Sequence, residues 1–232
     1  MNNIVKYFSS VSDGNMALHI LDDEKIVLQN RQKLANKLEM DMDNFLFMNQ
    51  VHGNKSVIVG KDDMGIGVYK IDDNFNCDSM VTSEKGVVLS VLVADCLPVL
   101  FYDEVGGVVG VAHAGWRGTC GKIVENTIKN MQILGSKIDD IKIIIGPGIS
   151  KNNYEVGEDV GCNFRDEVKS QLKDKKQYLD LFKQNYLDLL EMGVKKDNIE
   201  IIDKDTFSDE TYFSARRDGF YKGRFGGFIY IK

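Results

Sequence analysis

The sequence predicts an α+β layered sandwich, and three observations support this fold class. Segments with helical and with strand-like apolar spacing are mixed along the chain, without a low-complexity linker or an internal repeat. The centre of the chain carries several strand-like runs in succession. With 232 residues, of which 43% are hydrophobic, the chain has enough apolar side chains to bury the core of one domain.

The first third of the chain is predicted to form a helix followed by two short strands. Residues 22–40 carry apolar residues at near-helical spacing, and acidic residues crowd the start of this segment, as is typical of a helix N-terminus. Short apolar runs at residues 45–48 and 57–59 predict strands. Residues 60–76 are polar and contain glycine, so we expect a loop there.

The middle of the chain predicts three consecutive strands. Residues 87–94 form a nearly continuous apolar run, which is typical of a strand buried on both faces, and this run ends just before Cys96. Residues 98–103 predict the second strand. After a Gly-Gly turn, residues 108–112 predict the third strand, which ends at His113.

The last third of the chain mixes helices and strands. A glycine-rich corner at residues 115–121 leads into a helix with an apolar stripe. Residues 159–172 and 176–192 predict two further helices, and Gly193 suits the left-handed position that often follows a helix. Three more strands are predicted at residues 141–145, 198–202 and 228–231.

Composition and charge argue against several classes of function. A net charge of −6 disfavours a general nucleic-acid-binding face, which needs clustered basic residues. No apolar run approaches the roughly 18 to 20 residues of a membrane-spanning helix. Residues 1–6 show no basic region followed by a long apolar stretch, so we expect no secretory signal. We therefore expect a cytoplasmic protein that binds neither nucleic acid nor membranes. Its four cysteines form no CxxC pair and are expected to be thiols.

Two of the three histidines and one cysteine stand at predicted strand ends and suggest a metal site. His52 follows the strand at residues 45–48, Cys96 follows the first central strand, and His113 ends the third. Two imidazoles and one thiolate make three ligands, and a catalytic zinc typically keeps three and leaves the fourth position open. Asp95 could accept the second N–H of a metal-bound imidazole. The alternative is three unrelated polar residues at strand ends.

Other chemistry for the same residues stays open at this point. Cys96 could be the nucleophile of a cysteine hydrolase, with His113 or His52 as its base. Two histidines and a cysteine also resemble the equatorial ligands of a blue-copper site, although three histidines are too few for a multicopper cluster. A metal-binding protein without catalytic activity is a further alternative. His19 lacks polar motif neighbours and is expected to be structural or at the surface.

Several charged residues near turns are candidates for binding an anion. Arg117 lies in the Gly-Trp-Arg-Gly stretch that opens a helix, and the adjacent Arg216 and Arg217 precede an acid and a turn. Each could equally belong to a packed turn or to a solvated, salt-bridged face. Glu155, after a Gly-Pro-Gly turn, is a candidate for acid–base chemistry or for a substrate hydrogen bond.

Six motifs, in order along nearly the whole chain, resemble the YfiH/laccase-domain family, also called polyphenol oxidase-like proteins and now described as purine nucleoside phosphorylases. The matching segments are Gln50-Val51-His52-Gly53, Cys77-Asp78-Ser79-Met80-Val81-Thr82, Ala94-Asp95-Cys96-Leu97-Pro98-Val99, His113-Ala114-Gly115-Trp116-Arg117-Gly118, Gly146-Pro147 with Tyr154-Glu155-Val156-Gly157, and Ser214-Ala215-Arg216-Arg217-Asp218-Gly219. Each motif alone is weak, but the combination is highly specific. One departure is that residues 8–15 lack the arginine that family members usually carry near the start.

The resemblance implies a single domain over residues 1–232, with an α/β/β/α arrangement and mixed sheets. It implies that His52, Cys96 and His113 are zinc ligands and the catalytic centre. It also implies phosphorolysis of adenosine, inosine and methylthioadenosine, with adenosine deamination as a second activity. Substrate or phosphate contacts are expected from the motif residues Gln50, Asp78, Arg117, Glu155, Arg216 and Arg217.

We therefore predict a zinc-dependent purine nucleoside phosphorylase, whose small-molecule partners are purine nucleosides and phosphate. Asp78 and Glu155 are the candidates for the acid that helps the purine base to leave. A copper-dependent, laccase-like polyphenol oxidase and a cysteine hydrolase that uses Cys96 are the alternatives. The oligomeric state stays open.

Overall fold

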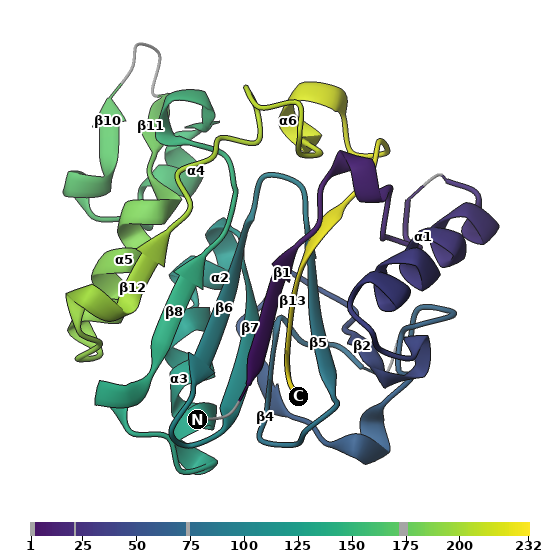
Figure 1. The fold of residues 1–232 in the computed structure, drawn as a ribbon. Helices are drawn as coiled ribbons and strands as arrows, with labels where there is room; N and C mark the ends of the chain where they lie inside the picture. Colours follow the sequence, from purple (N-terminus) through teal and green to yellow (C-terminus); the bar gives the residue numbers. More distant parts are fainter. Residues whose placement is uncertain (1–2, 21, 73–74, 172–175) are drawn as a thin grey trace.

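Two sheets packed face to face form the centre of the molecule, and helices cover both outer faces (Figure 1). The computed structural model describes residues 3–20, 22–72, 75–171 and 176–232. Helix α1 (Glu24–Lys37) lies over one sheet, at the right in Figure 1. Helices α3 (Ile123–Ile133) and α5 (Leu181–Glu191) lie beyond the other sheet. The predicted α+β layered sandwich with mixed sheets is thus confirmed.

The first sheet has four strands in the order β1-β13-β5-β2. These strands are β1 (Ile4–Phe8), β13 (Phe225–Ile231), β5 (Val88–Val93) and β2 (Phe45–Phe47). β2 runs parallel to β5, whereas the other two pairings are antiparallel. The β1–β13 pairing brings the first and last strands of the chain side by side.

The second sheet has six strands in the order β12-β8-β6-β7-β4-β3. These are β12 (Ile199–Ile201), β8 (Lys142–Ile145), β6 (Leu97–Asp103), β7 (Val108–Ala114), β4 (Ser79–Thr82) and β3 (Ser56–Ile58). A small third sheet contains β10 (Lys169–Gln171), β11 (Gln177–Leu179) and β9 (Glu155–Val156). Three short helices complete the fold, namely α2 (Trp116–Cys120), α4 (Glu158–Gly161) and α6 (Ala215–Asp218). Single 3-10 turns lie at Val11–Asp13, Met42–Asn44, Lys61–Asp63, Ile138–Asp140, Lys151–Asn153, Asp166–Val168 and Lys196–Asn198.

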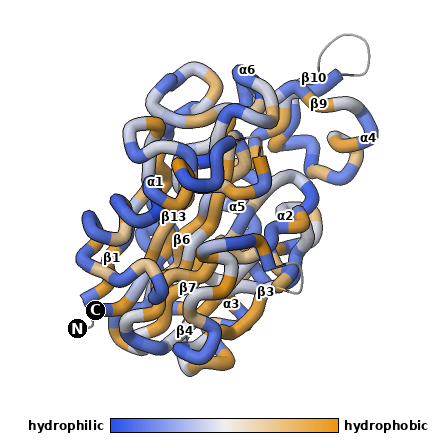
Figure 2. The backbone as a smooth tube through the Cα atoms, turned by 90° about the vertical axis from the view of Figure 1, so that its right-hand side faces the viewer, coloured by the Kyte–Doolittle hydropathy of each residue, from blue (hydrophilic) through white to orange (hydrophobic). Residues whose placement is uncertain are grey.

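The alternation of side chains along each strand divides the core into three layers. In β5, Val88 and Leu92 pack against α1, while Leu89, Val91 and Val93 pack against the second sheet. The outer face of the second sheet packs in turn on the apolar stripe of α3. Figure 2 shows the resulting concentration of apolar residues along β6 and β7. Because both faces of the central strands are covered, continuous apolar runs are favourable there.

The region after β9 differs from the prediction. Residues 159–172 do not form a helix: α4 ends at Gly161, and β10 begins at Lys169. The predicted helix at residues 176–192 begins only with Leu181, because β11 occupies its expected first turn. Pairing of β11 with both β9 and β10 overrides the local helical spacing. Gly193 has the predicted left-handed backbone, with φ of 92°.

The sequence analysis did not predict β1 and β4, which both lie in the N-terminal half of the chain. The other strands of the two large sheets lie at the predicted positions. The third central strand was expected to end at His113 and continues one residue further, to Ala114. Across the described ranges, no helix combines the length and the apolar composition that crossing a bilayer requires.

Candidate active site

His113 is buried inside β7 and is held by the aspartate at the start of the neighbouring strand. β4 pairs with β7 so that Ser79 lies opposite Ala112, which sets Asp78 beside His113. The His113 Nδ1–H donates to Asp78 Oδ1 over 2.9 Å, and the His113 backbone N–H donates to the Asp78 carbonyl over 2.8 Å. This contact leaves the other ring nitrogen, Nε2, as the free metal-binding atom of His113.

The same carboxylate fixes the loop that carries His52. Asp78 accepts the backbone N–H groups of residues 51–53, over 3.3, 3.0 and 2.7 Å. His52 itself has a left-handed backbone with φ of 58°. Burial raises the pKa of Asp78, but His113 and these amides outweigh it and the net pKa is lowered. Asp78, and not Asp95, is therefore the carboxylate that accepts the ring hydrogen bond of His113.

Cys96 lies in the short connection that carries the chain from β5 in one sheet to β6 in the other. The preceding residue, Asp95, has φ of 88°, which is unusual for a residue other than glycine. Its carboxylate accepts Thr206 Oγ1–H and the Arg216 backbone N–H, each over 2.7 Å. Its carbonyl accepts the Ile149 N–H over 2.8 Å. Three distant segments thus hold the backbone next to Cys96.

The structure brings the three predicted ligands together. One potential ligand atom from each of His52, Cys96 and His113 lies within 4.8 Å of the others. The two imidazole rings meet edge to face, with centroids 4.7 Å apart. Burial opposes a charge on Cys96, but His113 and hydrogen bonds from both histidines outweigh it and lower the thiol pKa. The His113 pKa is raised: burial lowers it, but the Cys96 thiolate and the Asp78 carboxylate outweigh that effect.

Gly115 leaves the space that this cluster needs. A Cβ atom at this position would lie 2.9 Å from Cys96 Sγ and 3.7 Å from His113 Nε2. Because the first distance is below any normal carbon–sulfur contact, a side chain here would displace the thiol. The glycine of the His-Ala-Gly-Trp motif is therefore explained by the close approach of its backbone to the cluster.

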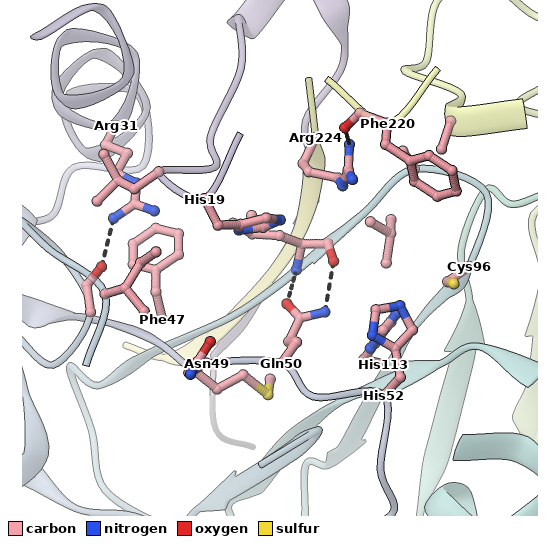
Figure 3. Close-up of a pocket in the computed structure, with 18 residues that line it drawn as sticks. His19, Arg31, Phe47, Asn49, Gln50, His52, Cys96, His113, Phe220 and Arg224 are labelled. Atoms are coloured by element: carbon pink, nitrogen blue, oxygen red, sulfur yellow. Dashed lines mark hydrogen bonds between the residues drawn. The ribbon is translucent and has the colours of Figure 1, made fainter. Parts of the chain in front are cut away.

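A cavity of about 380 Å³ opens onto the cluster (Figure 3). It runs from Cys96 and His113 to Arg31 and Phe47 at its other end. No aspartate or glutamate is among the described residues that line it, so its charged groups are basic. The lining residues are Leu18, His19, Arg31, Phe47, Met48, Asn49, Gln50, His52, Gly67, Ile71, Leu92, Val93, Ala94, Cys96, His113, Ala215, Phe220 and Arg224.

Three basic side chains of the cavity, those of His19, Arg31 and Arg224, were not identified from the sequence as site residues. His19 was expected to be structural or at the surface; it is exposed and also lines the cavity, where desolvation and the nearby charges of Arg224 and Arg31 lower its pKa to about 4. Arg224 directs Nη1 to the carbonyls of Phe220 and Gly223, over 3.1 and 2.8 Å. The available signal was the arginine that follows Gly223, directly before the last strand.

The two candidates Gln50 and Arg217 use their polar atoms within the protein. Gln50 lines the cavity, but its side-chain amide donates to the Leu92 carbonyl and accepts the Leu92 N–H, both over 2.8 Å. Arg217 donates to the carbonyls of Thr206, Phe207 and Tyr212 and to the Asp218 carboxylate. Both side chains therefore hold backbone segments around the site.

The remaining candidates lie outside the cavity lining. The exposed Arg117 stacks on its neighbour Trp116, with the guanidinium carbon 4.3 Å from the ring centroid. Arg216 donates to the Glu155 carbonyl over 3.0 Å, and the Glu155 carboxylate pairs with Lys176 over 2.8 Å. These residues surround the site without facing the cavity.

Residues 7–232 match the protein family described as multi-copper polyphenol oxidoreductase laccase. The chain is 36% identical over 224 residues to a purine nucleoside phosphorylase of Staphylococcus epidermidis, which covers 93% of this chain and 83% of the relative. It is 31% identical over 233 residues to an adenosine deaminase from an unknown prokaryotic organism, which covers 97% of this chain and 89% of the relative.

The fold agrees with these sequence matches. The crystal structure of the YfiH protein of Bacillus licheniformis superposes with a TM-score of 0.94 at 29% identity, covering 99% of this chain and 93% of that one. The resemblance predicted from the six motifs is therefore confirmed. This chain belongs to the multi-copper polyphenol oxidoreductase laccase family, and its relatives over nearly the full length include enzymes named for purine nucleosides.

Proposed function

We propose that this protein is a zinc-dependent purine nucleoside phosphorylase that acts on adenosine, inosine and methylthioadenosine and also deaminates adenosine. The observation that carries the proposal is a preorganised two-histidine, one-cysteine cluster in the wall of a cavity that has no carboxylate among its described lining residues. The names of the two relatives support the same reactions.

The cluster suits zinc for three chemical reasons. Two imidazoles and a thiolate form a three-ligand set, which leaves one position for a reactant. Asp78 fixes the tautomer of His113, as a carboxylate behind a zinc-bound histidine normally does. The lowered pKa of Cys96 supplies the thiolate form that binds metal. When bound, the metal supplies Lewis-acid chemistry by polarising an oxygen of an incoming reactant.

Arg224 is our candidate for holding phosphate. Of the two arginines that line the cavity, Arg224 lies nearer the cluster and Arg31 lies at the far end, whereas Arg117, Arg216 and Arg217 lie outside the lining. Its Nη1 is used by backbone carbonyls, and its Nε and Nη2 make no hydrogen bond to any described residue. A guanidinium with two free, coplanar donors suits bidentate binding of a phosphate.

In phosphorolysis, a phosphate oxygen forms a bond to C1′ of the ribose while the bond from C1′ to the purine nitrogen breaks. The purine takes the electron pair and the proton that hydrogen phosphate releases, so that ribose 1-phosphate and the neutral base are formed. The pKa of His19 is lowered to about 4, so its neutral imidazole can donate a hydrogen bond to the departing base. The absence of carboxylates from the described cavity lining avoids repulsion of the phosphate.

Phosphate-dependent release of free base from adenosine and inosine tests this function, measured by chromatography on protein of known zinc content. We expect Cys96→Ala to lose both the metal and the release of base, because it removes the thiolate ligand. Cys162→Ala is the matched control, since Cys162 is an exposed thiol outside the cluster, and it should keep full activity. Full phosphorolysis by Cys96→Ala would contradict the proposal.

The family description also favours a second candidate, a copper-dependent phenol oxidase. Only three histidines occur in the chain, and two of them lie in the cluster, so a multicopper centre lacks ligands. Oxygen uptake with phenols on copper-loaded protein distinguishes this candidate from the phosphorylase. Alkylation of Cys96 in the metal-loaded protein would instead favour a cysteine hydrolase.

A further inference from the structure

Phe220 lines the same cavity as the metal-ligand cluster, yet its side chain is 71% exposed. Figure 3 shows its ring beside Arg224, on the side of the cavity that holds Cys96 and opposite Phe47 and Arg31. A large aromatic ring that lines a cavity and is this exposed has most of its surface available for a ligand.

Hydrogen bonds and two glycines with unusual backbone angles define the turn around Phe220, although the Phe220 ring itself is exposed. Gly219 has φ of 84°, and a Cβ atom there would meet nothing within 4 Å, so the backbone angle alone explains the glycine. Gly223 has φ of 154°, and a Cβ atom there would lie 2.4 Å from the Phe213 ring. The Arg224 guanidinium donates to the carbonyls of Phe220 and Gly223. The turn that presents Phe220 is thus attached to a charged residue of the cavity.

We propose that Phe220 forms one face of the purine subsite, where its ring stacks on the base of a bound nucleoside and covers the cavity mouth. This inference rests on the proposed function and names the residue that would recognise the base. The cluster and Arg224 supply polar groups for phosphate and ribose, whereas Phe220 supplies a flat apolar face. Because every purine has a π-face, stacking selects ligands that carry a base and tolerates different purines.

Binding measurements on Phe220→Ala test the proposal with three ligands, namely adenosine, free adenine and ribose 1-phosphate. We expect binding of adenosine and of adenine to weaken by about tenfold, as for the loss of one base–aromatic stacking contact. Binding of ribose 1-phosphate, which has no base, and the zinc content should not change. In turnover, KM for adenosine should rise while kcat stays near the wild-type value.

Tyr221→Ala is the matched control, because Tyr221 is the adjacent residue, is 66% exposed and does not line the cavity. It should leave all three affinities unchanged. Phe220→Trp should retain adenosine binding, and its emission should be quenched by the stacked base, which gives a readout independent of turnover. The wild-type protein, with its single tryptophan, provides the background signal.

The outcomes separate this inference from the proposed function. Wild-type affinity of Phe220→Ala for adenosine would overturn the inference, as would equal losses for adenosine and ribose 1-phosphate. If the stacking pattern is found but phosphate never releases a base, the purine subsite stands and the phosphorylase activity fails. If phosphate releases base equally well from wild type and Phe220→Ala at low adenosine concentration, the activity stands and the subsite fails.

Discussion

At the residue scale, the candidate metal centre depends on one carboxylate that is not itself a predicted ligand. Asp78 is fully buried, and it accepts one imidazole N–H and three backbone N–H groups. A buried carboxylate is stable only when such donors surround it. The same four hydrogen bonds orient His113 directly and His52 through its loop, so both histidines are positioned by one residue.

We therefore expect Asp78→Asn to weaken zinc binding by about 10- to 100-fold, the usual cost of losing a carboxylate behind a metal-bound histidine. The neutral amide cannot favour the His113 tautomer as strongly, and its NH₂ group faces donors. Competition with a chromophoric chelator measures the affinity. Asp103→Asn is the control, because Asp103 is equally buried and accepts backbone N–H groups in the β6–β7 turn. An unchanged zinc affinity in Asp78→Asn would contradict this role.

Individual site residues could be predicted from the sequence where a metal-ligand residue type stands at the end of a strand-like apolar run. His52, Cys96 and His113 were predicted as one cluster because each stands at the end of an apolar run, and the structure brings them together. The partner of His113 was not predictable from spacing, because Asp78 reaches it through the pairing of β4 with β7, and β4 was not recognised as a strand. His19 acquires its place in the cavity only through tertiary packing.

At the element scale, the region from residue 159 to residue 180 explains how a helical pattern can mislead. Val160, Phe164 and Val168 recur every four residues, which predicts one face of a helix. Phe164 and Val168 do enter the same core, but Phe164 lies in a bend after α4, and Val168 ends the 3-10 turn that leads into β10. Pairing of β11 with strands on either side of it decides the outcome, and this pairing joins segments that no local pattern connects.

The start of α5 offers a test of local stabilisation. Asp180 precedes the helix and accepts the Lys183 backbone N–H over 2.9 Å, which satisfies one of the free donors of the first turn. We expect Asp180→Ala to lower the free energy of unfolding by about 1 kcal/mol. Urea unfolding followed by circular dichroism measures the change.

Asp41→Ala is the matched control for this capping effect. Asp41 occupies the same position before the Met42–Asn44 turn, but its side chain makes no capping hydrogen bond. Its replacement should change the free energy of unfolding by less than about 0.5 kcal/mol, as for an ordinary surface substitution. Equal destabilisation by the two substitutions would show that the Asp180 hydrogen bond contributes nothing specific.

At the scale of the whole molecule, the candidate active site lies where the two large sheets meet. His52 follows β2 of the first sheet, His113 lies in β7 of the second, and Cys96 lies in the connection between β5 and β6. The layered fold was predictable because the central strands are apolar on both faces, which requires covering layers on either side. Strand order was not predictable, since it depends on contacts between distant segments.

The hydrogen bonds of Asp205, close to the Thr206 that binds Asp95, make the free energy of unfolding depend on pH. Asp205 accepts the Ser150 N–H over 2.9 Å and hydrogen bonds from the side chains of Asn153 and Ser208, and its backbone bridges to Gly148. Partial burial raises the Asp205 pKa, but these hydrogen bonds outweigh it, so the folded-state pKa lies below the ordinary value of 3.8. Its stabilising contribution is therefore complete above that value and is lost as the pH falls through the folded-state pKa.

We accordingly expect Asp205→Asn to lower the free energy of unfolding at pH 7 by about 1 to 2 kcal/mol, because hydrogen bonds to a charged carboxylate are replaced by weaker ones. The difference from wild type should shrink as the pH falls from 5 towards 3, because protonation removes the same charge from the wild-type protein. Thermal unfolding across this pH range measures it. Asp203→Asn, at an exposed position two residues away, should give a small difference at every pH. A difference for Asp205→Asn that is constant across the range would mean that packing, and not the charge of Asp205, holds these segments.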